Sequence, residues 1–467
     1  MTTFVEAAAQ QEERTDNGMK ALKSTGDALV NLFFNIGASR GKDIVPAFIA
    51  AYVEDIDLSL RIALWARDAR GGAGERKLFR DILEYLETTN PDAAKKLLAK
   101  IPEIGRWDDV FSFKTTEMKE AAFTLIGDAI KSGDGLAAKW SPRKGDTAVA
   151  FRKFLGWSPK TYRKTLVNLT KVVETAMCAN TWDDINFSHV PSLASARYKK
   201  AFNRHTPKFA EYVEALVKGD PTVKVNAGAV FPYDVLKGVG NFDYDITEKG
   251  HVVAQWDALP NYIGDANILP LVDVSGSMDC SAGGNGSITC MDIAVSLGLY
   301  ISDKNTGKFK DTFITFSAQP ELLTLRGNIV EKALQMVNSK WGMSTNLHAA
   351  FELILNLAIK FSLPASEMPE ILLILSDMQF DSCARFDDSA MEMIERKYND
   401  AGYTTPKIVF WNLQASGNVP VASHKSGAAL VSGFSPSLVT SILKADMTQF
   451  TPVGIMMETI TNPRYDV

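Results

Sequence analysis

The chain has 467 residues, of which 46% are hydrophobic and 22% are charged, the composition of an ordinary globular protein. This length exceeds what one hydrophobic core usually serves, so we expect about two to four domains. A net charge of −5 gives no general attraction to nucleic acid, which leaves only a local basic surface for such binding. No apolar run approaches the length of a membrane span, and we expect no membrane partner.

The cysteines are widely spaced and include no Cys-x-x-Cys pair: Cys178, Cys280, Cys290 and Cys383. This spacing predicts reduced thiols in a cytoplasmic protein.

Charge is distributed unevenly along the chain. Residues 265–467 carry 14 Lys and Arg against 21 Asp and Glu, whereas the residues before them carry 36 against 34. The acidic balance therefore belongs to the C-terminal part, and the N-terminal part is free to be locally basic.

Residues 1–221 are predicted to form an α-helical repeat domain of HEAT type, after a polar lead-in. Apolar residues recur at helical spacing, as at Leu29, Leu32 and Phe33, and short Gly, Pro or Asn breaks separate successive helices. The next segment, residues 222–264, has little helical periodicity and is interpreted as a connector with some extended parts.

Two of the helix breaks repeat the tripeptide Trp-Asp-Asp, at residues 107–109 and 182–184. The repetition favours an array of helical hairpins. As local chemistry, we expect each Trp to pack under a turn and the first Asp to cap the next helix.

The loop from Arg67 to Arg76 contains four arginines around Gly71-Gly72-Ala73-Gly74. Glycines of this kind let a phosphate approach backbone N–H groups. The spacing of a nucleoside-triphosphate loop is absent, and we prefer a tight turn between helices in which arginine pairs with Asp68.

Two basic stretches stand out in the helical part, and both are interleaved with aromatic residues. Basic side chains neutralise phosphates and aromatic rings stack on bases, so the stretches are candidate RNA contacts. The alternative, held about equally, is a solvated helix surface whose aromatic rings point inward. The candidate RNA-binding residues are Lys139, Arg143, Lys144, Arg152, Lys153, Arg163 and Lys164 in the first stretch, and Arg197, Lys199, Lys200, Arg204 and His205 in the second.

From residue 265 onward, apolar strands alternate with amphipathic helices, which predicts a mostly parallel sheet covered by helices on both faces. The predicted strands are 268–273, 311–316, 321–325, 371–376, 406–411 and 428–431, and the predicted helices are 288–302, 328–338, 347–361, 387–401, 436–445 and 450–460.

Oxygen-bearing side chains follow three of these segments. Asp273, Ser275 and Ser277 come directly after a buried strand, Thr345 precedes a helix, and Asp377 ends another buried strand. Carboxylates and hydroxyls meeting at the carboxyl edge of a sheet suit Mg²⁺ or another divalent cation. The sequence therefore predicts a metal site made of these five residues.

The order Asp-Val-Ser-Gly-Ser-Met, Trp-Gly-Met-Ser-Thr-Asn and Leu-Ser-Asp-Met-Gln-Phe-Asp resembles the metal-ion-dependent adhesion site (MIDAS) of von Willebrand factor A (vWA) domains. With N-terminal motifs such as Gly105-Arg-Trp-Asp-Asp109, the whole chain resembles an uncharacterised vWA-containing family of plants, large DNA viruses and phages. Its architecture also resembles the TROVE-type Ro ribonucleoproteins. These likenesses imply a TROVE-like helical array over 1–221 and a Rossmann-like vWA domain over 265–467, a fold class of α plus α/β.

The resemblance to Ro proteins implies a ring of helices that binds structured RNA outside and single-stranded RNA ends inside. No general base or nucleophile with a partner His accompanies the metal motif, so we expect no enzymatic activity. The leading hypothesis is a cytoplasmic RNA- or ribonucleoprotein-binding scaffold with a metal-binding vWA domain. The alternative is a protein–protein adhesion module without RNA, in which the metal binds an acidic group of a partner. A metal-dependent hydrolase is a weaker third.

Overall fold

The computed structural model describes residues 12–16, 18–227, 230–236, 246–282, 288–316, 319–337, 346–380, 390–414, 419–444 and 450–467. The chain divides into two compact units. The sheet unit comprises residues 1–42 and 227–463, and the helical unit comprises residues 43–226 and 464–467. Within the described ranges, no helix is long and apolar enough to cross a membrane.

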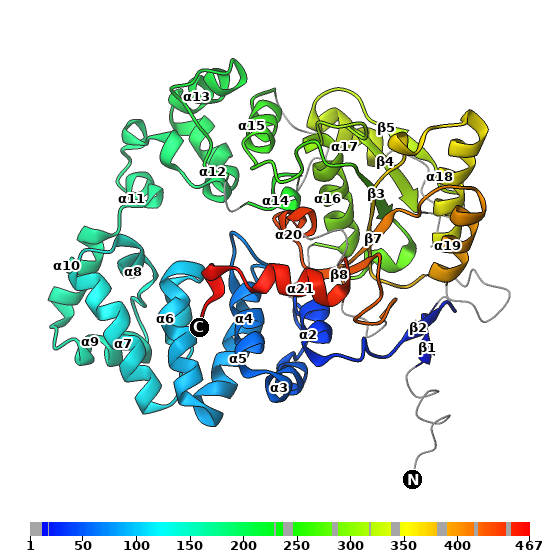
Figure 1. Ribbon diagram of the computed structural model, residues 1–467. Coiled ribbons are helices and arrows are strands. Elements are labelled where there is room, and N and C mark those ends of the chain that lie inside the picture. Colours follow the sequence, from blue (N-terminus) through cyan, green and yellow to red (C-terminus); the bar gives the residue numbers. More distant parts are fainter. Residues whose placement is uncertain are drawn as a thin grey trace, which may run out of the picture. The chain divides into compact units, whose positions relative to one another are not determined.

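The sheet unit is built on six strands in the order β5-β4-β3-β6-β7-β8 (Figure 1). All neighbours pair in parallel except β4 and β5, which are antiparallel, so the predicted mostly parallel sheet is confirmed. The chain leaves β3 towards one edge and returns at β6 towards the other, which is a topological switch point. The strands are β3 (Ile268–Asp273), β4 (Thr312–Phe316), β5 (Leu322–Thr324), β6 (Ile371–Ser376), β7 (Lys407–Asn412) and β8 (Ala428–Ser432).

Helices cover this sheet where the alternation predicts them. α16 packs on β3, β4 and β6, and α18 contacts β4. Gly298 allows α16 to approach closely, because a Cβ there would lie 2.4 Å from Cγ2 of Val272 in β3. The helices after β3 are α16 (Cys290–Lys304), α17 (Ile329–Val337), α18 (Leu347–Phe361), α19 (Ala390–Asp400), α20 (Leu438–Lys444) and α21 (Pro452–Ile460).

The start of the chain belongs to the sheet unit. The hairpin of β1 (Glu12–Arg14) and β2 (Lys20–Leu22) leads into α2 (Ala28–Ile36), which packs on β8. Six of the nine residues of α2 are buried, and so apolar a helix needs cover on several sides. The Ser432 hydroxyl joins the two elements, since it donates to the carbonyl of Phe33.

Two helices lie in the segment for which little helical periodicity was predicted. α14 (Pro232–Leu236) and α15 (Ile246–Asp257) both belong to the sheet unit. α14 has five residues, which is too short for a 3.6-residue period to show in the sequence.

The helical unit is a succession of helices, as predicted. Neighbours along the chain from α3 to α7 pack on one another, and polar caps such as Asp55 and Asn90 begin the helices after the breaks. The helices are α3 (Val45–Glu54), α4 (Ile56–Arg67), α5 (Arg76–Thr89), α6 (Pro91–Ile104), α7 (Thr116–Lys131), α8 (Gly135–Trp140), α9 (Asp146–Phe154), α10 (Pro159–Leu169), α11 (Val173–Cys178), α12 (Ser192–His205) and α13 (Lys208–Val217).

The first Trp-Asp-Asp copy begins a short 3₁₀ segment, Trp107–Phe111. The prediction that its first Asp caps a helix is wrong, because Asp109 is the residue that accepts from the backbone N–H of Arg106 (3.0 Å). Asp109 is fully buried and also accepts from Nε of Arg67 (2.8 Å) and Nε of Arg80 (2.7 Å). The motif therefore holds three segments of the helical unit together.

The second copy, Trp182–Asp184, has a different environment. The Asp183 carboxylate accepts from the Thr206 hydroxyl (2.7 Å) and caps no helix, and the Trp182 ring stacks on His205 with centroids 4.3 Å apart. Asp184 is exposed. The repeated tripeptide thus performs two different packing tasks.

This contrast predicts the stability of two matched variants. Asp109→Asn leaves the Arg67 and Arg80 guanidinium groups without their buried counter-charge, and we expect a loss of about 3 kcal/mol in the free energy of unfolding. Asp184→Asn changes an exposed residue and should alter it by less than about 0.5 kcal/mol. Urea unfolding measures both, and equal effects would contradict the role assigned to Asp109.

Candidate functional site

Two carboxylates meet at the switch point of the sheet. Asp273 is the last residue of β3, and Asp377 directly follows the last residue of β6, Ser376. The two strands pair in parallel with Val272 opposite Leu375, so the register brings both carboxylates to the same carboxyl edge. Open sheets of this kind bind ligands at the crevice where the strand order reverses.

Hydroxyl groups from the loop after β3 connect these carboxylates. Oδ1 of Asp273 accepts from the backbone N–H of Ser275 (2.9 Å), and the Ser275 and Ser277 hydroxyl oxygens lie 3.0 Å apart. The Ser277 side chain hydrogen-bonds to Asp377. The structure therefore brings together four of the five predicted metal-binding residues, and Thr345 lies outside the described residues.

Sequence reasoning missed one member of the site, Ser376. Its hydroxyl donates to Oδ2 of Asp273 (2.5 Å) and accepts from the backbone N–H of Met378 (3.0 Å). The signal available was its place directly before Asp377, opposite Asp273 once the β3–β6 register is known. Ser376 orients Asp273 from behind, on the side away from the loop.

The electrostatics of the two carboxylates are unfavourable as they stand. Burial, and next the charge of Asp377, raise the pKa of Asp273 to about 7. Burial also raises the pKa of Asp377. The partners found for Asp273 in the described chain are hydroxyl and N–H groups rather than a basic side chain. A divalent cation between the carboxylates would remove this repulsion.

The donor set fits a hard cation such as Mg²⁺, which prefers oxygen ligands and keeps several waters. In the described ranges, no three His, Cys, Asp or Glu side chains gather as a metal cluster. This site offers two carboxylates, and its other donors are hydroxyls. Ser275 is buried whereas Ser277 is exposed, so the pocket opens to solvent on the Ser277 side.

The loop from Arg67 to Arg76 is a closed turn. The N–H groups of Gly72 and Gly74 both donate to the carbonyl of Asp68 at 3.1 Å, so neither is directed at a phosphate. The buried Asp68 carboxylate does pair with an arginine, but this is Arg464 near the C-terminus rather than one from the loop. The preferred interpretation as a tight turn agrees with this geometry, with a different arginine as the partner.

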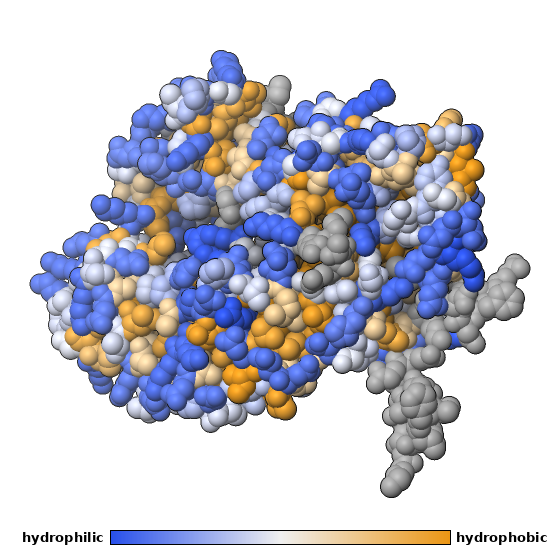
Figure 2. Space-filling model, in the orientation of Figure 1, coloured by the Kyte–Doolittle hydropathy of each residue, from blue (hydrophilic) through white to orange (hydrophobic). Residues whose placement is uncertain are grey.

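The candidate RNA-binding residues lie mostly at the surface of the helical unit, and nine of the twelve are exposed. Lys199 aside, none of the twelve forms an ion pair with an acid in the described chain. Other exposed lysines of this unit are paired, as in Lys77–Asp81 and Lys95–Glu117. Hydrophilic residues line the edge of the unit where α10 lies (Figure 2). The two stretches thus present cationic charge that the protein itself does not neutralise.

The aromatic residues between these cations face inward. Tyr162 is buried and its hydroxyl donates to the carbonyl of Pro142 (2.8 Å). The Trp140 ring lies beneath the Arg106 guanidinium at 3.8 Å, and the Tyr198 hydroxyl donates to Glu174 (3.1 Å). These rings support the fold, so the surface offers charge for phosphates and little for stacking on bases.

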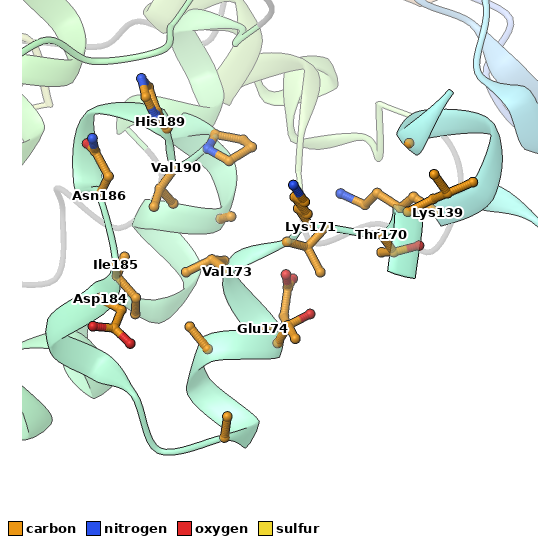
Figure 3. Close-up of a pocket in the computed structure, with 18 of the residues that line it drawn as sticks. Lys139, Thr170, Lys171, Val173, Glu174, Asp184, Ile185, Asn186, His189 and Val190 are labelled. Atoms are coloured by element: carbon orange, nitrogen blue, oxygen red, sulfur yellow. The ribbon is translucent and has the colours of Figure 1, made fainter. Parts of the chain in front are cut away.

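An open pocket of about 900 Å³ lies in the helical unit beside the first basic stretch (Figure 3). Lys139, Thr170 and Lys171 line one side, while Asn186 and His189 line the other. Asp134, Glu174 and Asp184 also line it, so acidic side chains offset the two lysines. The pocket does not extend the cationic surface.

Comparison with known proteins places the chain among uncharacterised sequences. Two family models match, each described as a domain of unknown function: DUF7788 over residues 267–459 and DUF2828 over residues 144–266. The chain is 29% identical over 511 residues to the uncharacterised protein L728 of Acanthamoeba polyphaga mimivirus, covering 96% of this chain and 86% of that protein. The predicted likeness to uncharacterised proteins that include viral ones is thus confirmed, without an activity.

A solved structure, the Ro (RSR) protein of Deinococcus radiodurans, aligns over 96% of both chains with a TM-score of 0.38 and 12% identity. This likeness is too slight to transfer a ligand from that protein to this one.

The site predicts a specific response to Mg²⁺. At a hundredfold excess over its Kd, Mg²⁺ should raise the free energy of unfolding of the native chain by about 2.7 kcal/mol. Asp273→Asn should abolish most of this gain, yet in EDTA it should be at least as stable as the native chain because it removes the repulsion with Asp377. The exposed Asp279→Asn in the same loop is the matched control and should keep the gain. A gain of equal size in all three proteins would exclude this site.

Proposed function

We propose that this protein is a non-enzymatic binding scaffold whose sheet unit is a vWA-type domain with a metal-ion-dependent adhesion site. The observation that carries the proposal is the meeting of Asp273, Ser275, Ser277 and Asp377 at the switch point of a doubly wound sheet. Mg²⁺ or another divalent cation would be held by these four residues, with Thr345 as the fifth predicted ligand. When bound, the cation supplies an open coordination position for a carboxylate of a partner protein.

The arrangement of charge supports binding rather than catalysis. The two carboxylates are held by hydroxyl and backbone groups, and no described histidine contacts them. His348, the histidine nearest to Thr345 in the sequence, contacts Lys397 (2.6 Å) and Glu352 (3.3 Å) instead. With two negative charges among its ligands, a divalent cation keeps positive character only in part, which suits reversible capture of an acidic side chain.

Selection from a random peptide library tests this function. Peptides captured by the full chain in Mg²⁺ and released by EDTA should be enriched in Asp and Glu. Asp273→Asn should lose this capture, while Asp279→Asn should retain it. Peptides that bind equally in EDTA, or that lack acidic residues, would contradict a metal-dependent adhesive site.

A second function, binding of structured or single-stranded RNA by the helical unit, is favoured by the unpaired cations of the two basic stretches. The acidic balance of the sheet unit does not oppose it, because screening confines exposed charges to a range of about 10 Å at 0.1 M salt. Since the neighbouring aromatic rings are packed, we expect contacts with phosphates and weak preference for sequence.

Charge reversal at matched positions tests this second function. Arg163→Glu with Lys164→Glu changes two exposed cations of the first stretch, and Lys96→Glu with Lys119→Glu makes the same change on exposed parts of α6 and α7. The first pair should weaken binding of a structured RNA and flatten its salt dependence by roughly 0.7 to 0.9 per lost phosphate contact. The second pair should change it little. Salt-independent binding, or equal loss in both variants, would contradict the assignment.

A further inference from the structure

Two cysteines lie side by side directly after the candidate metal loop. The Sγ atoms of Cys280 and Cys290 are 3.4 Å apart, and the backbone N–H of Cys290 donates to the carbonyl of Cys280 (3.0 Å). Their neighbours Ser281 and Thr289 form an antiparallel bridge, so the two cysteines face each other across a short ladder. Residues opposed in this way have Cα atoms about 4.5 to 5.5 Å apart, within the range that a disulfide spans.

The two thiols differ in their access to solvent. Cys280 is partly exposed, whereas Cys290 is fully buried as the first residue of α16. The Cys290 thiol also lies 3.4 Å from the carbonyl of Leu413. A small oxidant therefore reaches Cys280 first, and Cys290 is placed behind it as the second thiol.

We propose that Cys280 and Cys290 are a redox modification site, a dithiol that hydrogen peroxide closes to an intramolecular disulfide and that a thiol reductant reopens. The chemistry needs no metal and does not depend on the proposed adhesive function.

The two steps balance. The Cys280 thiolate attacks one oxygen of peroxide, forming an S–O bond and breaking the O–O bond, and the departing hydroxide takes up a proton to become water. The Cys290 thiol then loses its proton and attacks the Cys280 sulfur. The S–S bond forms, the S–O bond breaks, and the hydroxide leaves with that proton as a second water. Two thiols lose two electrons in total, and peroxide gains them.

Closure of the disulfide has a structural consequence. The Cys290 S–H that faces the Leu413 carbonyl is lost, and the end of the 3₁₀ segment Gly276–Asp279 becomes covalently fixed to the start of α16. That segment contains Ser277, so oxidation ties the loop of the candidate metal site to a core helix.

The experiment uses the full chain with Cys178→Ser and Cys383→Ser, which leaves only the proposed pair. After stoichiometric peroxide, we expect both thiols to disappear together from alkylation with a maleimide. The tryptic peptide 250–304, which contains both cysteines, should lose the mass of two hydrogen atoms, and dithiothreitol should restore it. Adding Cys280→Ser should slow the loss of the remaining thiol by about tenfold or more, because the buried Cys290 is left alone.

Three results would overturn the proposal: thiols lost one at a time as sulfinic acid, a disulfide that links two chains, or an oxidation rate unchanged by Cys280→Ser. If the Ser variants do not fold, sequential alkylation of the native chain before and after reduction maps the pairing instead. Pairing of Cys280 or Cys290 with Cys178 or Cys383 in that measurement would equally reject it.

Discussion

The parallel pairing of β3 with β6 is the constraint on which the candidate site depends. Both strands are continuous apolar runs buried on both faces, and their register places Asp273 beside Ser376 and Asp377. No other arrangement of these strands would carry two carboxylates to one edge. The cost of burying like charges is then met by hydroxyls and backbone N–H groups, which leaves the site suited to a cation from outside.

The helical unit treats its buried carboxylates differently. Asp109 accepts from Arg67 and Arg80, and Asp68 from Arg464. There each negative charge is matched by a guanidinium of the same chain, and the pairs tie distant segments together. Buried acids therefore serve packing in one unit, while in the other they stay without a basic partner from the described chain at Asp273. This difference is the physical reason to place a metal in the sheet unit.

Cationic charge shows the complementary pattern. Several lysines before residue 132 are paired with acids on neighbouring helices, whereas the basic residues between 139 and 205 are left to solvent. A surface whose charge is not balanced internally gains more from an anionic ligand, because few intramolecular pairs must break. The inward-facing aromatic rings direct that ligand contact towards phosphate.

The sequence by itself determined the elements and the chemistry of the metal loop. Buried parallel strands are continuous apolar runs, so the bounds of β3 and β6 could be read directly, and so could the oxygen-bearing residues that follow them. Local patterns cannot reveal partners distant in the chain. The pairing of Arg464 with Asp68, the support of Asp273 by Ser376, the packing of α2 on β8 and the approach of Cys290 to Cys280 depend on register and side-chain geometry. Periodicity carries no such information, and only the tertiary structure decided them.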